Sequence, residues 1–103
     1  MDKTTANTHW SEDFALDQLR EAGLELLDRN YRTQRGEIDL VLQEQSTVVF
    51  VEVRYRTSNA YGTPEETVDA RKQSRLQLAA QVFLQQHRDP HNTYCRFDVF
   101  AVS

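Results

Sequence analysis

The chain has few of the residues that cross-link a protein, break its helices or anchor it in a membrane. Its 103 residues include one cysteine, two prolines and three glycines. A lone cysteine permits no disulfide within the chain, which is typical of a reducing compartment. No apolar run approaches the roughly 20 residues of a membrane span, and Met1–Thr5 leads into no apolar signal-peptide core. We therefore expect a cytoplasmic protein that makes no contact with a membrane.

Positive charge is also scarce. Twelve lysines and arginines stand against 16 acidic residues, so the net charge is −4. Nucleic-acid binding depends on basic contacts to phosphate, and this total argues against it. The segment 29–75 is the exception, because it carries eight basic and seven acidic residues. We expect any contacts to nucleic acid to come mainly from basic residues of this segment, namely Arg32, Arg35, Arg54, Arg56, Arg71 and Arg75.

Two runs with the alternation of β-strands, 37–43 and 47–56, form the centre of the sequence. In the first run the two faces are predicted to hold Ile38, Leu40 and Leu42 against Asp39 and Val41. In the second they hold Val49, Val51, Val53 and Tyr55 against Phe50, Glu52 and Arg54. The stretch VVFVEV is apolar on both faces apart from Glu52, which predicts a strand covered on both sides.

The acid inside this apolar stretch predicts a binding site. An unpaired buried carboxylate costs several kcal/mol, so we expect a cation or a positive side chain beside Glu52. If Gln45–Ser46 is a two-residue loop, Glu44 pairs with Thr47 and the same register brings Asp39 opposite Glu52. Opposed like charges repel, and a divalent ion between them would turn repulsion into binding. Carboxylate oxygens suit Mg²⁺ or Mn²⁺. A one-residue slip in register would separate the pair.

The remaining segments predict an α/β fold. After a flexible N-terminus, 1–10, we expect a single domain, 11–103, in which the hairpin is flanked by a helix, a strand, a longer helix and a last strand, over 11–22, 24–32, 65–87 and 93–102. A strand–helix–strand crossover makes the last two strands parallel. The prediction is a three-layer α/β/α fold of order α-β-β-β-α-β with a mixed sheet. Gly36 is expected to allow a positive φ or a close backbone approach.

The hairpin resembles the PD-(D/E)xK nuclease superfamily, in which an Asp on one strand is followed by Glu-x-Lys on the next. The matching residues are Ile38-Asp39 and Glu52-Val53-Arg54, with arginine in place of the lysine. The chain is still more similar to the YraN-like bacterial family, which is related to archaeal Holliday-junction resolvases. This similarity covers most of 11–102 and rests on SEDFALDQLREAGLELLDRNYR, RGEIDL, VVFVEVRYR, KQSRL and RFDVFAV.

The resemblance implies a restriction-endonuclease-like fold and a metal-dependent endonuclease acting on DNA, with branched DNA as a candidate substrate. It also implies a homodimer, and a Mg²⁺ or Mn²⁺ ion held by Asp39 and Glu52. Resolvase-like members add a carboxylate from an N-terminal helix, and Glu12 stands at the matching position. The alternative for Glu12 is a first-turn acid that the helix dipole favours.

The missing lysine leaves two candidates for the positive charge at the site. Arg54 can stabilise charge but cannot exchange a proton with an attacking water, because arginine stays protonated. Lys72 lies in the core-facing stripe near the start of the second helix and offers a substitute. The alternative is that Lys72 buries its methylene groups and extends its amine to solvent.

A second function stays open beside the nuclease. The fold can be retained while the chemistry is weakened or lost, which leaves a module that binds nucleic acid or a protein partner. The arginine at position 54 and the negative net charge favour this alternative. Retention of the three carboxylates favours the nuclease.

Overall fold

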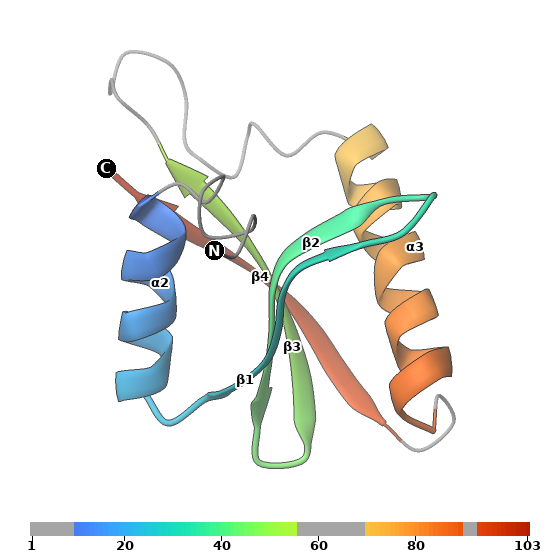
Figure 1. The fold of residues 1–103 in the computed structure, drawn as a ribbon, viewed down its shortest axis with the longest axis horizontal. Coiled ribbons are helices and arrows are strands. Elements are labelled where there is room, and N and C mark those ends of the chain that lie inside the picture. The colour runs from blue at the N-terminus through green and yellow to red at the C-terminus, as the bar shows by residue number, and fades with distance from the viewer. Residues whose placement is uncertain (1–9, 56–69, 90–92) are drawn as a thin grey trace, which may run out of the picture.

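The computed structural model describes residues 10–55, 70–89 and 93–103, and it has the predicted order α-β-β-β-α-β (Figure 1). Its elements are α2 (Trp10–Glu21), β1 (Glu25–Arg32), β2 (Glu37–Glu44), β3 (Thr47–Tyr55), α3 (Ala70–His87) and β4 (Tyr94–Val102). The predictions for residues 1–9 of the flexible N-terminus, for the part of the second helix before Ala70 and for Arg56 lie outside the described residues, whereas Trp10 already belongs to α2.

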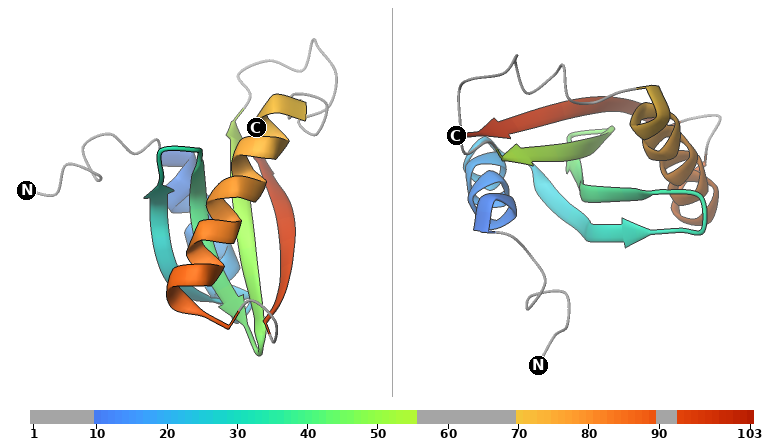
Figure 2. Two further views of the ribbon diagram at one scale, coloured as in Figure 1. Left: turned by 90° about the vertical axis from the view of Figure 1, so that its right-hand side faces the viewer. Right: turned by 90° about the horizontal axis from the view of Figure 1, so that it is seen from above.

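The four strands form one mixed sheet between two helices, as predicted. The strand order is β1-β2-β3-β4; β1 and β2, and β2 and β3, are antiparallel, and β3 and β4 are parallel. α2 covers one face of this sheet and α3 the other, which makes three layers (Figures 1 and 2). Neither helix is long and apolar enough to cross a membrane within the described part of the chain.

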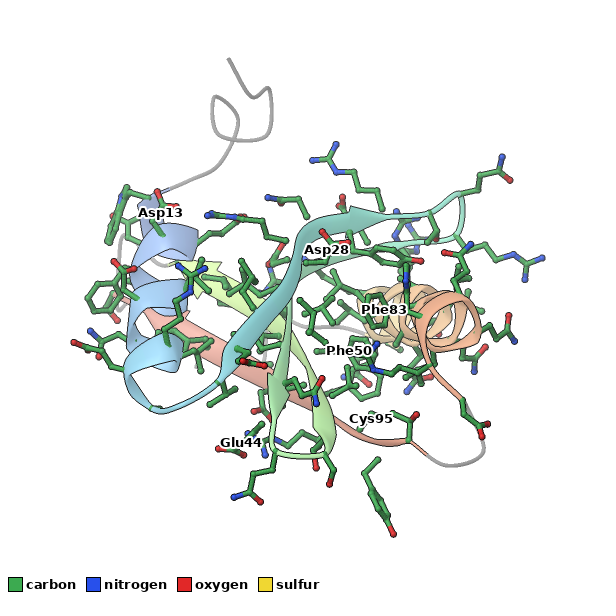
Figure 3. All side chains as sticks on the ribbon, turned by 60° about the horizontal axis from the view of Figure 1, so that its bottom comes forward. Asp13, Asp28, Glu44, Phe50, Phe83 and Cys95 are labelled. Carbon is green, nitrogen blue, oxygen red and sulfur yellow. The ribbon has the colours of Figure 1, made fainter. Side chains whose placement is uncertain are left out.

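Each face of the sheet has its own apolar cluster. Against α2, the cluster includes Leu16, Leu40, Leu42, Val49 and Val51. Against α3, it includes Ile38, Val41, Phe50, Leu76 and Phe83. The Phe50 and Phe83 rings meet edge to face, with centroids 5.9 Å apart, in the layer between sheet and helix (Figure 3). β3 is covered on both faces because its alternate residues enter different clusters.

The predicted face of Ile38 was wrong. It does not share a side with Leu40 but packs in the α3 cluster. The ladder between β2 and β3 ends at Leu40 and Val51. The first residues of β2 stay paired with β1, and this β1–β2 hairpin extends over α3 (Figure 1). Asn30, which lies between the β1 residues paired with Ile38 and Leu40, has φ 55°, a conformation uncommon outside glycine. The resulting change of direction carries Ile38 to the other side.

The register between β2 and β3 is the predicted one. Glu44 pairs with Thr47 across the turn Gln45–Ser46, in which Gln45 has φ 54°. One residue beyond the last pair of this ladder, the side chains of Asp39 and Glu52 are hydrogen-bonded to each other.

Gly36 makes the close backbone approach that was one of its two predicted roles. A Cβ atom built at this position would lie 2.0 Å from the carbonyl oxygen of Arg75 in α3. The turn between β1 and β2 therefore rests directly on the helix backbone, where a side chain has no room.

The Gly36→Ala substitution is expected to lower the free energy of unfolding by about 3 kcal/mol, because hairpin and helix must separate to admit the methyl group. Urea denaturation followed by circular dichroism measures the loss. Gly23→Ala is the matched control: Gly23 has φ 99° and open space around its Cβ position, so it costs only the backbone strain of about 1 kcal/mol. Equal losses in the two variants would show that the contact with Arg75 is unimportant.

Candidate active site

Two acidic side chains from neighbouring strands meet near the C-terminal end of β3. Glu52 is buried, with 5% of its surface exposed, and Asp39 Oδ2 accepts a hydrogen bond of 2.9 Å from the backbone N–H of Val53. Burial, a hydrogen bond to Glu52 and the charge of Glu52 together raise the pKa of Asp39 from 3.8 to about 8. At neutral pH Asp39 is therefore largely protonated, and a proton stands where a cation could bind.

Two basic side chains contact the buried acid. Lys72 Nζ lies 2.6 Å from Glu52 Oε2, and Arg54 Nη2 lies 3.7 Å from the same oxygen. The predicted positive partner of Glu52 is thus present twice. Lys72 is in the first turn of α3, and a crossover helix starts beside the end of the strand that precedes it. The amine of Lys72 contacts the carboxylate of Glu52. A catalytic role for Lys72 stays a prediction.

Glu12 lies on the α2 side, close to the pair but held by other residues. Its Oε1 accepts a hydrogen bond of 3.3 Å from Asn30 Nδ2 and is 3.9 Å from Arg29 Nη2. Burial is the main cause that raises the pKa of Glu12, and the charge of Glu52 adds to it. The charge of Glu12 in turn contributes to the raised pKa of Asp39. The three carboxylates therefore interact through their charges.

A hard divalent ion fits between Asp39 and Glu52 more readily than among Asp39, Glu52 and Glu12 together. Among the described residues, no group of three or more His, Cys, Asp or Glu is arranged to hold a metal. Mg²⁺, however, is commonly held by one or two carboxylates with waters and substrate phosphates completing its shell. Asp39 and Glu52 would supply those carboxylates, and Glu12 would join through water or after it leaves Asn30.

Four of the predicted nucleic-acid contacts lie around one surface beside this site. A hollow of about 290 Å³ is lined by Glu37, Arg71, Lys72, Arg75 and Leu76. Arg32 forms an ion pair of 3.5 Å with Glu37, and Arg35 is exposed and precedes Gly36, which packs on Arg75. We call Arg32, Arg35, Arg71, Lys72 and Arg75 the basic surface.

Arg54, also predicted to contact nucleic acid, turns inward to Glu52, with 21% of its side chain exposed. Sequence reasoning did not identify the residues that hold Glu12. Asn30 and Arg29 position this carboxylate, and neither was a predicted site residue. One signal was available, since asparagine is depleted in strands and tolerates positive φ.

Comparison with known proteins gives a family but no activity. Residues 11–102 match the model of the family described as "Uncharacterised protein family UPF0102". A "UPF0102 protein" from Pseudomonas savastanoi pv. phaseolicola is 51% identical over 92 residues, which cover 89% of this chain and 75% of the relative. Another from Stutzerimonas stutzeri is 47% identical over 103 residues, which cover 100% of this chain and 86% of the relative.

Proposed function

Because this chain belongs to the uncharacterised protein family UPF0102, whose name assigns no activity, we propose a function from the site itself. We infer a metal-dependent endonuclease that hydrolyses phosphodiester bonds in DNA. The observation that carries the proposal is the contact between Asp39, Glu52 and Lys72 at the border of the basic surface. Paired carboxylates beside an ammonium suit the hydrolysis of a phosphate ester.

Each side chain has a defined part in this proposal. The ion, when bound, polarises the phosphoryl oxygen and lowers the pKa of an attacking water. Asp39 and Glu52 supply its carboxylate oxygens. Lys72 and Arg54, which both contact Glu52, would stabilise the negative charge that develops on the phosphate. The basic surface holds the flanking phosphates in position. A resolvase-like preference for branched DNA belongs to the same proposal.

The direct test is cleavage of labelled oligonucleotides by the purified protein with Mn²⁺ or Mg²⁺. Linear duplex, four-way junction and single-stranded DNA of shared sequence are compared, together with RNA of that sequence. Cleavage that EDTA stops and Asp39→Asn removes is the expected result. If no substrate is cut with either ion, the nuclease proposal is wrong for the protein in isolation.

Mn²⁺ binding is expected to release about one proton and to tighten about tenfold per pH unit between pH 6 and pH 8. The cause is the pKa of Asp39 near 8, since the carboxyl must lose its proton to bind the ion. Calorimetric titrations in buffers of different ionisation enthalpy measure the released proton. Paramagnetic broadening in NMR spectra locates the ion, and it should centre on the amides of Asp39 and Glu52.

Asp39→Asn is expected to remove both effects, whereas Asp17→Asn, an exposed change in α2, should leave them in place. Broadening that spreads over surface acids and spares Asp39 and Glu52 would contradict the site.

DNA binding by the protein is expected to be weak and to depend steeply on salt, because few phosphates can be contacted by a chain of net charge −4. Replacing Arg71 and Arg75 by alanine should weaken binding and reduce the slope of log affinity against log salt by about 1 per residue. Fluorescence anisotropy over a series of salt concentrations gives the slope. Arg20→Ala, on the exposed face of α2, is the control, and an equal effect there would refute the basic surface as the binding site.

A second function rests on a specific observation. Glu52 already has two cationic partners, and in the described residues no third acid is arranged with the pair to hold a metal. A protein that keeps these ion pairs in place of a metal would bind nucleic acid or a protein partner without cutting. Binding to DNA that is insensitive to Mn²⁺, with no cleavage, would favour this function.

A further inference from the structure

β4 forms one edge of the sheet and leaves an apolar surface exposed. It pairs with β3 in an unbroken parallel register, and no other strand of the described residues pairs with its outer edge. Its apolar side chains remain accessible: Tyr94 is 74% exposed, Phe97 47% and Val99 38%. Long edge strands with exposed apolar side chains are sites where another strand adds.

The opposite edge of the sheet, β1, has irregularities that hinder pairing with another strand, and β4 does not. β1 has a register shift between Leu26 and Asp28 and a positive φ at Asn30. Bulges and bends of this kind turn an edge away from pairing. The described part of β4 has no such break, and its sequence from Tyr94 to Val102 contains neither glycine nor proline. Of the two edges, β4 is therefore the one suited to an incoming strand.

We propose that β4 pairs antiparallel with β4 of a second copy of this chain, about a two-fold axis at Phe97. The two sheets then continue into each other. Such a contact is isologous, because both copies use the same residues. The inference does not depend on nuclease activity.

The sequence of β4 is complementary to itself in this register. Antiparallel pairing centred on Phe97 places Arg96 of each copy opposite Asp98 of the other. Cys95 then faces Val99, and Tyr94 faces Phe100. Each cross-strand pair joins either opposite charges or two apolar side chains, and both kinds stabilise a sheet. Within one copy Arg96 also contacts Asp98 at 3.1 Å, so the interface would hold two arginines and two aspartates in alternation.

Neighbouring registers do not share this complementarity. A two-fold axis at Arg96 would place the two arginines opposite each other, and an axis at Asp98 would do the same with the two aspartates. Like charges directly opposed destabilise a sheet. Sliding one strand past the other by one residue would place Asp98 opposite Phe97 and Arg96 opposite Val99. The charges therefore select the axis at Phe97.

The surface beside β4 has room for the second copy. α3 packs over β2 and the Phe50 side of β3 and leaves a hollow of about 300 Å³ beside β4, whose lining includes Phe50, Leu76, Phe97 and Val99. The Phe97 ring stacks on Phe50 with centroids 5.3 Å apart, which fixes one of its faces and leaves it partly exposed. In the dimer, the Phe97 rings of the two copies would lie side by side at the axis and reduce this exposure.

A disulfide tests the register. The Val99→Cys protein contains two thiols, because Cys95 is exposed and native. In the proposed pairing, Cys95 of each copy faces position 99 of the other, within the span of a disulfide. We expect oxidation to give a covalent dimer, and peptide mapping to show positions 95 and 99 joined. The wild-type protein should not cross-link, because its two Cys95 residues are four positions apart along the paired strands.

The control is Gln81→Cys, which adds an exposed thiol on α3 away from β4. Cross-linking of Val99→Cys no faster than this control would overturn the proposal. The proposal would also be overturned if sedimentation velocity showed the wild-type protein as a monomer at every concentration, because β4 would then not pair with a second copy.

A charge reversal tests the pairing without a covalent bond. Arg96→Asp sets acid against acid at two places and is expected to raise the dimer dissociation constant about tenfold or more. Adding Asp98→Arg to the same chain restores opposite charges and should recover most of the affinity. Arg96 also binds Glu44 at 2.7 Å, so Glu44→Gln serves as the control for that lost contact. A dimer unaffected by Arg96→Asp, or a double variant no better than the single one, would overturn the proposal.

Discussion

The Lys72→Ala protein is expected to lose Mn²⁺-dependent cleavage by about a hundredfold or more, in the range seen when one group that stabilises transition-state charge is removed. Lys72 Nζ is 2.6 Å from Glu52 Oε2, so in the proposed mechanism the ammonium would lie beside the ion and the scissile phosphate. Arg54 is 3.7 Å from the same oxygen and stays protonated, so it cannot act as an acid or base. Arg54→Ala is therefore expected to have the smaller effect on turnover.

Single-turnover cleavage with saturating protein separates these contributions from DNA binding. Circular dichroism checks that each variant is folded, and Gln81→Ala is the control for a change on the same helix. Lys72→Arg keeps the charge but cannot lose its proton, so its pH–rate profile shows whether the charge or the proton transfer matters. Full activity in Lys72→Ala would mean that Lys72 serves only to neutralise Glu52. If Arg54→Ala were the more damaged variant, Arg54 would have the role that the proposed mechanism gives to Lys72.

The second large effect is on stability. Without metal, the wild-type protein is expected to lose stability as pH rises from about 4 to about 8, relative to Asp39→Asn. The pKa of Asp39 is about 8 in the folded protein and its ordinary value is 3.8. Between these values the folded state holds a proton that the unfolded state has released, and so unfolding becomes more favourable as pH increases. At pH 7 the difference corresponds to on the order of 4 kcal/mol.

Urea denaturation of both proteins in EDTA, at a series of pH values, measures this difference. The two stabilities should converge at low pH, where Asp39 is protonated in both states, apart from the constant effect of the substitution. Asp17→Asn should run parallel to the wild type, because Asp17 is exposed on α2. A wild-type curve parallel to that of Asp39→Asn would show that the two carboxyl groups do not interact in solution.

These two experiments also separate the two candidate functions. A stability that falls with pH and is recovered by Mn²⁺ would indicate that the ion replaces the proton between the carboxyl groups. The same pH dependence with no response to Mn²⁺ would leave Asp39, Glu52 and Lys72 as a buried network that stabilises the fold. In that case the basic surface would account for whatever nucleic-acid binding is measured.

Local pattern was enough to predict the architecture and the central pair of acids. Alternation of apolar side chains identifies the strands, because successive residues point to opposite faces. A two-residue turn sets every later pair in an antiparallel ladder, so the pairing of Glu44 with Thr47 brings Asp39 beside Glu52. The presence of Glu52 in an apolar strand also predicts a positive partner beside it, and Lys72 and Arg54 are such partners.

Other features depend on how distant segments pack, and no local pattern contains them. The hairpin of β1 and β2 bends over α3. This bend moves Ile38 into the apolar cluster against α3 and brings Gly36 onto the backbone of Arg75. That same contact brings Arg32 and Arg35 close to the hollow that Arg71 and Arg75 line, although the sequence separates the two pairs by more than a third of its length. The resemblance to resolvase-like proteins placed Glu12 near the acids, but its hydrogen bond to Asn30 arises only where α2 meets β1. The sequence alone determined the strands, their register and the buried charge, because these follow from neighbours along the chain. The tertiary structure decided which charges meet, because that depends on the bend of the hairpin and on where each helix crosses the sheet.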